Sequence, residues 1–138
     1  HPVSVMAWLI LMVFFSGCGG SVRQQQYLVQ GSRIYAGYCA NCHQADGSGL
    51  AALYPPLSGS DWLKDRPDEV ICAIRNGLSG PVTVNGVTYE QPMPANPDLT
   101  DLEIAELITW MRTEWAGDTA VYSAAKVRQA LDNCQAVR

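Results

Sequence analysis

The chain has 138 residues, of which 48% are hydrophobic and 16% are charged. This composition excludes a disordered chain and a protein with several membrane spans, and the length suits a single domain with one core. The net charge is −4, and the basic residues form no continuous block. Nucleic-acid binding is therefore not expected.

The first 17 residues read as an export signal or a membrane anchor, because residues 3–15 are apolar and uncharged. A helix of this length spans about 20 Å, whereas a hydrocarbon core is about 30 Å thick, which favours the export signal. The run ends in Phe15, Ser16, Gly17 and Cys18, which resembles a bacterial lipobox and predicts lipidation of Cys18. An ordinary thiol is the alternative. Residues 18–26 are then the lipidation site and a short polar tether, and the domain lies outside the cytoplasm at a membrane.

Four helices are predicted in the remaining chain, with one β-hairpin between the second and the third. The first covers residues 26–40, and the second covers residues 67–76, with proline at its first position and glycine after its end. Thr100 and Glu103 form a capping box at the start of the third, whose apolar residues recur at helical spacing up to residue 115. The fourth covers residues 123–133. The Asn85-Gly86 pair between β-branched runs predicts a hairpin over residues 82–89, so the fold class is all-α with a small β-hairpin insertion.

A C-x-x-C-H motif runs from Cys39 through Cys42 to His43. This is the pattern of c-type haem attachment, in which two thiols add to the haem vinyl groups and the histidine binds the iron. A zinc half-site and a thioredoxin-like redox pair are the alternatives. A zinc site needs a second pair of ligands, but Cys72 and Cys134 stand singly. A redox pair needs a βαβ setting, whereas the surroundings are helical. We therefore expect one covalent haem c, with His43 as an axial iron ligand.

The second axial ligand follows by elimination. The only other histidine, His1, lies in the export segment with two of the four methionines, and Met111 belongs to the apolar stripe of the third helix. Met93 remains, in a loop stiffened by a proline on each side; a packing role is the alternative. Ligation by histidine and methionine fills both axial positions, which suits electron transfer and not oxygen or peroxide chemistry.

Together these motifs resemble the class I monohaem cytochromes c over residues 31–115. The resemblance rests on GSRIYAGYCANCHQADGSGL, YPPLSGSDWL, the Met93-Pro94 pair and LTDLEIAELITWMR. It implies a class I cytochrome c fold with a cytochrome domain over residues 27–115. Residues 116–138 form a C-terminal helical extension that we expect to pack on this domain.

The resemblance also implies specific contacts. Gly31 and Tyr35 of the first helix would pack against the face of the last core helix that bears Leu107, Ile108 and Met111. A proline carbonyl would accept a hydrogen bond from the His43 ring, which fixes the ring and tunes the ligand. Pro55 matches this position best, and Pro56 is the alternative. Trp62 would either line the haem or a propionate, or be an ordinary core residue.

The remaining cysteines, Cys72 and Cys134, are predicted to form a disulfide. Cys39 and Cys42 are used by haem and Cys18 by lipid, and an even remainder in an oxidising compartment favours a bond. The bond would fasten the extension to the haem domain, provided that the two Cα atoms lie within about 7 Å. A buried free Cys72 and a free terminal Cys134 are the alternative.

The predicted function is electron transfer by a membrane-tethered cytochrome on the periplasmic side of a bacterial membrane. Its partners would be the membrane and redox proteins of a respiratory chain, with no small-molecule substrate and no catalytic residue. The extension resembles the tail of membrane-bound bacterial cytochromes c, and the nearest specific resemblance is the monohaem subunit of alternative complex III. A peroxidase-like haem enzyme, which needs an open iron position and a distal acid or base, and a haem-based sensor with a displaceable ligand are the alternatives.

Overall fold

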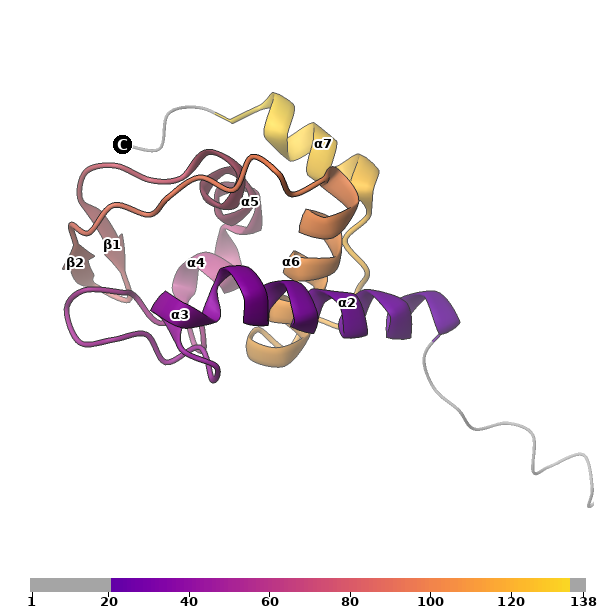
Figure 1. The fold of residues 1–138 in the computed structure, drawn as a ribbon, viewed down its shortest axis with the longest axis horizontal. Coiled ribbons are helices and arrows are strands. Elements are labelled where there is room, and N and C mark those ends of the chain that lie inside the picture. The colour runs from indigo at the N-terminus through magenta and orange to yellow at the C-terminus, as the bar shows by residue number, and fades with distance from the viewer. Residues whose placement is uncertain (1–20, 135–138) are drawn as a thin grey trace, which may run out of the picture.

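The structure, a computed structural model, describes residues 21–134, so Cys18 and the expected export segment lie outside the described residues. The described part is mainly helical with one small hairpin, as predicted (Figure 1). No helix of the described part is long and apolar enough to cross a membrane. The elements are α2 (Val22–Tyr38), α3 (Ala40–His43), α4 (Asp61–Asp65), α5 (Pro67–Asn76), β1 (Val82–Val84), β2 (Val87–Tyr89), α6 (Asp101–Trp115) and α7 (Ala124–Asp132).

Local sequence signals place the ends of three helices and the hairpin turn. Helix α5 starts at proline and stops at a glycine with φ of +72°, and the hydroxyl of Ser123 caps α7. At the start of α6 the Thr100 side chain accepts from the backbone of Glu103, whose carboxylate accepts from the Thr100 N–H at 2.8 Å. The predicted capping box is thereby confirmed. The strands pair antiparallel on either side of Asn85 and Gly86, and both of these residues have positive φ.

The first helix differs from the prediction at both ends. Helix α2 begins at Val22, so residues 22–26 are helical and not part of a polar tether. The hydroxyl of Ser21 accepts from the N–H of Gln24 and caps the helix, while the Gln24 amide donates to the carbonyl of Thr119 at 2.7 Å. The helix ends at Tyr38. Cys39 therefore lies between α2 and α3, and the other residues of the motif, from Ala40 to His43, form the separate short helix α3.

Helix α4 was not predicted, although its start carries a recognisable signal. Ser60 accepts a hydrogen bond from the N–H of Leu63 and is the N-cap of this five-residue helix. A serine followed by an acidic residue is a common helix start. The short length of α4 left too few residues for a helical repeat of apolar positions to be visible in the sequence.

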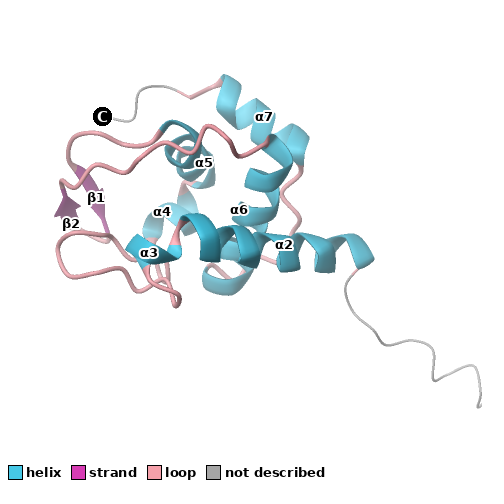
Figure 2. Ribbon diagram, in the orientation of Figure 1, coloured by secondary structure: helices cyan, strands magenta, loops and turns pink. Residues whose placement is uncertain are grey.

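Helices α2 and α6 cross at Gly31 (Figure 2). A Cβ atom at this position would lie 2.5 Å from Cβ of Trp110 and would also meet the carbonyl oxygen of Glu106. The backbones can approach this closely because glycine has no side chain. The predicted crossing of the first and last core helices is confirmed.

The contact between α2 and α6 includes a cluster of aromatic rings that was not predicted. The ring of Tyr35 packs against Trp110 and Trp115, with ring centroids 5.0 and 5.1 Å away, and the two tryptophans are also in contact. The residues that were expected to meet Gly31 and Tyr35 are all buried in the core, namely Leu107, Ile108 and Met111. Met111 also lines the cavity described below.

The C-terminal extension packs on the domain through α7. Helix α7 contacts α5 and α6, and Figure 1 shows it lying across these two helices at the opposite side from α2. Val127 and Ala130 of α7 are buried, as is Tyr122 in the segment that leads to it. The extension thus supplies one wall of the hydrophobic core.

Candidate haem site

Cys39 and His43 of the C-x-x-C-H motif and Met93 line an apolar cavity. A second, smaller cavity shares His43, Pro55 and Met93 with the first and reaches exposed residues such as Leu53 and Gln91. The space therefore runs from the core to the surface. The larger cavity is lined by Cys39, His43, Pro55, Pro56, Leu57, Ser60, Trp62, Val70, Ala73, Ile74, Leu78, Val82, Val84, Met93 and Met111.

The imidazole of His43 is buried and held in one orientation. Its Nδ1 lies 2.9 Å from the carbonyl oxygen of Pro55, and the side chain is only 9% exposed. Because a carbonyl only accepts, Nδ1 carries the hydrogen and Nε2 keeps its lone pair. Burial lowers the pKa of His43, and the hydrogen bond to Pro55 opposes this to a smaller extent. The result is a neutral imidazole, the form that binds metals. Of the two prolines considered, Pro55 is the partner.

Backbone hydrogen bonds hold the loop that carries Pro55 against α3. The N–H of Gly49 donates to the carbonyl of His43 at 2.9 Å, and the N–H groups of Leu57 and Ser58 both donate to the carbonyl of Gly47. The loop therefore returns to the helix end from which it starts. This return brings the Pro55 carbonyl to the histidine ring, although the two residues are separated by 12 positions.

Met93 is held by the chain that follows α5. Its N–H and carbonyl pair with Leu78 at 3.0 and 2.9 Å, and a Cβ at Gly77 would lie only 2.5 Å from the Met93 carbonyl oxygen. Asn96 donates from both its backbone N–H and its side-chain amide to the carbonyl of Ile74, at 3.1 and 3.0 Å. The sequence analysis found Met93 but missed Asn96, whose position before a proline was the available turn signal.

The two cysteines of the motif are partly buried free thiols. Burial raises the pKa of Cys39 to about 12, and the neighbouring Cys42 adds to the rise. A redox-active thiol pair needs a lowered pKa, so this environment disfavours the thioredoxin-like alternative. Within residues 21–134 no three His, Cys, Asp or Glu side chains are grouped as a metal site would require, and the zinc alternative finds no support there.

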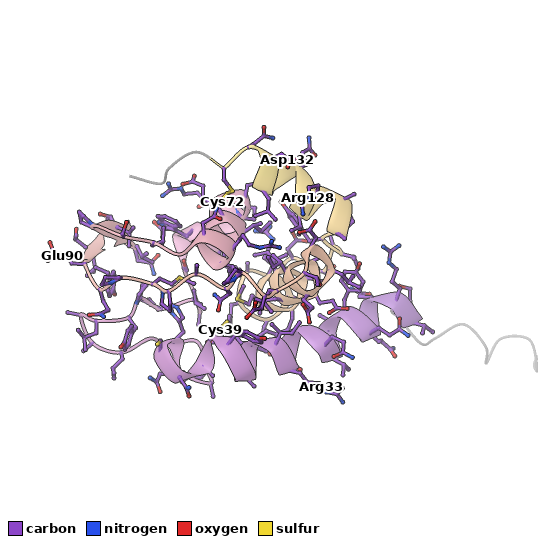
Figure 3. The ribbon with its side chains drawn as sticks, turned by 45° about the horizontal axis from the view of Figure 1, so that its top comes forward. Arg33, Cys39, Cys72, Glu90, Arg128 and Asp132 are labelled. Atoms are coloured by element: carbon purple, nitrogen blue, oxygen red, sulfur yellow. A yellow bond between two sulfur atoms is a disulfide. The ribbon has the colours of Figure 1, made fainter. Side chains whose placement is uncertain are left out.

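The structure joins Cys72 and Cys134 by a disulfide (Figure 3). Their Cα atoms are 5.7 Å apart, within the range that the bond requires. The bond connects α5 to the end of α7, where the sequence analysis predicted it.

Trp62 lines the larger cavity, but its indole N–H is already used. Nε1 donates to the carbonyl of Thr83 in β1 at 2.8 Å, and the ring is 7% exposed. Trp62 therefore links α4 to the hairpin and packs on the cavity wall. Trp62 thus lines the candidate haem cavity, whereas its donor is not available to a propionate.

The donor groups and the cavity fit a covalent haem. The space is enclosed mainly by apolar side chains, and the thiol of Cys39, the imidazole of His43 and the thioether of Met93 all lie on its wall. The thiol of Cys42 lines the adjoining cavity. Imidazole and thioether are the ligand pair that gives haem iron a raised potential.

Comparison with known proteins identifies the class. The family model described as "Cytochrome C oxidase, cbb3-type, subunit III" matches residues 27–111. A cytochrome c-552 of Thermus thermophilus is 34% identical over 116 residues, which cover 81% of this chain and 71% of the relative. The fructose dehydrogenase cytochrome subunit of Gluconobacter japonicus is 34% identical over 72% of this chain, but over only 21% of its own length. The cytochrome c subunit of a quinone-dependent alcohol dehydrogenase from Gluconacetobacter polyoxogenes is 30% identical over 75% of this chain and 23% of its own length.

The chain therefore belongs to the monohaem class I c-type cytochromes. It carries covalent haem c, and its role is electron transfer and not catalysis.

Proposed function

We propose that Cys39 and Cys42 hold the haem through thioether bonds, and that His43 Nε2 and Met93 Sδ are the two axial ligands. The main support for this assignment is that His43 and Met93 both line one apolar cavity. Each of the two residues is also held in place by hydrogen bonds. His43 is fixed by the Pro55 carbonyl and Met93 by its backbone pairing with Leu78.

In this assignment the haem supplies a reversible one-electron iron couple, and the protein sets its properties. Pro55 holds the hydrogen on Nδ1, so Nε2 stays available as a donor in both oxidation states. The two-sided backbone pairing of Met93 keeps a weak thioether ligand in place, and the apolar walls exclude water. The thioether ligand and the apolar walls favour the reduced state, whereas the hydrogen bond to Pro55 makes the imidazole a stronger donor to the iron. The fixed positions of both ligands limit the structural change that accompanies electron transfer.

The smaller cavity offers the route by which electrons enter and leave. It is lined by surface loops around Leu53 and Gln91. The two segments that form these loops, residues 44–60 and 78–96, carry one charged residue each, Asp46 and Glu90. A partner would therefore meet a largely uncharged surface at this point.

We further propose that the chain works as a membrane-tethered cytochrome on the periplasmic side of a bacterial membrane, passing electrons between respiratory redox proteins. The lipobox-like sequence that ends at Cys18 supports this setting. Three residues separate Cys18 from Val22 at the start of α2, and the four steps from Cys18 to Val22 extend at most about 14 Å. A short tether of this kind suits a subunit of a larger complex, of which the monohaem subunit of alternative complex III is the specific form.

The ligand assignment is tested by replacing Met93 with alanine. Met93→Ala should keep the covalent haem but lose the long-wavelength absorption band that sulfur–iron ligation gives the oxidised protein, and it should lower the reduction potential. Met111 is the other thioether on the cavity wall, so Met111→Leu is the matched variant. This swap conserves volume and costs less than about 1.5 kcal/mol, and the band should remain. A band that persists in Met93→Ala would refute the assignment.

A further inference from the structure

Helix α5 lies between the haem cavity and the C-terminal segment, defined here as residues 116–134. One face of α5 contributes Val70, Ala73 and Ile74 to the cavity wall. Its other face is covered by α7. Helix α5 is therefore held between the haem site on one face and the C-terminal segment on the other, and a change in the C-terminal segment would change the support of α5 from that side.

The C-terminal segment is tied to α5 by two direct links. The disulfide joins Cys72, in the middle of α5, to Cys134 after the end of α7. The hydroxyl of Tyr122 donates to the carboxylate of Asp68 in the first turn of α5. Helix α7 has nine residues, too few to be stable in isolation, so its docking depends on these links and on the burial of its apolar face.

A third link runs through α6. The carboxylate of Asp101 accepts from Arg75 at the end of α5 at 3.0 Å and from Arg128 of α7 at 2.8 Å. Arg75 and Asp101 are each about one-quarter exposed. The links at Asp68, Cys72 and Arg75 together hold α5 at its start, its middle and its end.

The end of α5 in turn carries the Met93 loop. The Ile74 carbonyl accepts both hydrogen bonds of Asn96, which lies three residues after Met93. Leu78, two residues beyond the helix, exchanges two backbone hydrogen bonds with Met93. A displacement of α5 would therefore carry the methionine loop with it, whereas His43 is held by a different part of the chain.

We propose that the disulfide-fastened C-terminal segment positions the sulfur of Met93, acting through α5 and Asn96. The inference rests on the proposed ligation by Met93. Cys72, Cys134 and Asn96 are positioning residues in this arrangement, since none of them is assigned a bond to the haem. Loss of the bond should weaken the sulfur–iron contact more than it weakens the fold as a whole.

The experiment compares two unfolding transitions in each of four haem-loaded proteins in guanidinium chloride. The sulfur–iron band reports the methionine ligand, and far-ultraviolet circular dichroism reports the helices. The proteins are the unmodified chain, the double variant Cys72→Ala/Cys134→Ala, Asn96→Ala, and Trp110→Ala as a control. Trp110 belongs to the α2–α6 contact and not to the cavity wall, so its loss destabilises the fold away from α5.

In the double variant and in Asn96→Ala, the guanidinium concentration at which half of the sulfur–iron band is lost should decrease more than the concentration at which half of the helix signal is lost. The reduction potential should also decrease. In Trp110→Ala the two midpoints should fall together. Equal falls in the double variant would overturn the inference while leaving Met93 as the ligand. Absence of the band in the unmodified chain would overturn both.

The disulfide itself is checked by alkylating the denatured, haem-loaded protein and measuring its mass. Cys72 and Cys134 should take up no alkyl group before reduction and two after it. Uptake of two groups without reductant would show that the bond is absent, and the inference would fall.

Discussion

Replacing Gly31 by alanine should destabilise the protein, although alanine is the better helix former. The new Cβ would lie 2.5 Å from Cβ of Trp110 and would also meet the carbonyl oxygen of Glu106, whereas ordinary contacts begin near 3.4 Å. Neither obstacle is the free end of a flexible side chain. Helices α2 and α6 would have to separate by about 1 Å at their crossing.

Two opposing effects decide the size of the change. Forcing extra volume into a packed contact costs about 1–3 kcal/mol, and the rigid obstacles place this site in the upper half of that range. Replacing a glycine in a helix interior by alanine stabilises the folded state by about 1 kcal/mol. The free energy of unfolding should therefore decrease by about 1–2 kcal/mol, which corresponds to a fall in Tm of roughly 4–8 °C for a domain of this size.

Gly37 provides the matched control in the same helix. A Cβ at Gly37 would meet no atom within 4 Å, so Gly37→Ala should raise the free energy of unfolding by up to about 1 kcal/mol. The assay is thermal and guanidinium unfolding of the haem-loaded proteins followed by circular dichroism. If Gly31→Ala stabilised the protein as Gly37→Ala does, the close approach at the helix crossing would be refuted.

Two further predictions concern acid stability and the membrane anchor. The hydrogen bond from Arg112 holds the pKa of Asp118 below its usual range. The ionised carboxylate therefore stabilises the fold fully above about pH 4, and this stabilisation is lost as the pH falls through the lowered pKa of the folded protein. Asp118→Asn should therefore reduce stability in urea by less than about 1 kcal/mol at neutral pH, since the side chain is partly exposed. The difference from the unmodified protein should shrink as the pH is lowered below about 4, and a difference that stays constant over this range would contradict the prediction. For the anchor, intact mass should show Cys18 carrying at least two acyl chains, because one chain holds only marginally, and Cys18→Ser should release the domain or leave an uncleaved precursor. An unmodified Cys18 in a chain that retains the apolar run of residues 3–15 would show that this run is the anchor.

The sequence alone determined which residues were available for the chemistry. With His1 in the predicted export segment, His43 was the only histidine left for the predicted domain, and Met93 was the one methionine between two prolines. Scarcity made elimination effective, and the same reasoning paired Cys72 with Cys134. Short-range signals also determined the capping box of α6 and the hairpin turn, because their hydrogen bonds join residues only a few positions apart.

The tertiary structure decided how these residues are held. The sequence favours Pro55 but leaves Pro56 open, and only the path of the loop places the carbonyl of Pro55 beside the histidine ring. The contact of Tyr35 with Trp110 and Trp115 depends on the angle at which α2 and α6 cross, which the apolar pattern of α6 does not specify. The hydrogen bonds of Asn96 to Ile74 join residues 22 positions apart. Contacts of this kind arise only when separate segments meet in space, and they are what carries the support of the C-terminal segment to Met93.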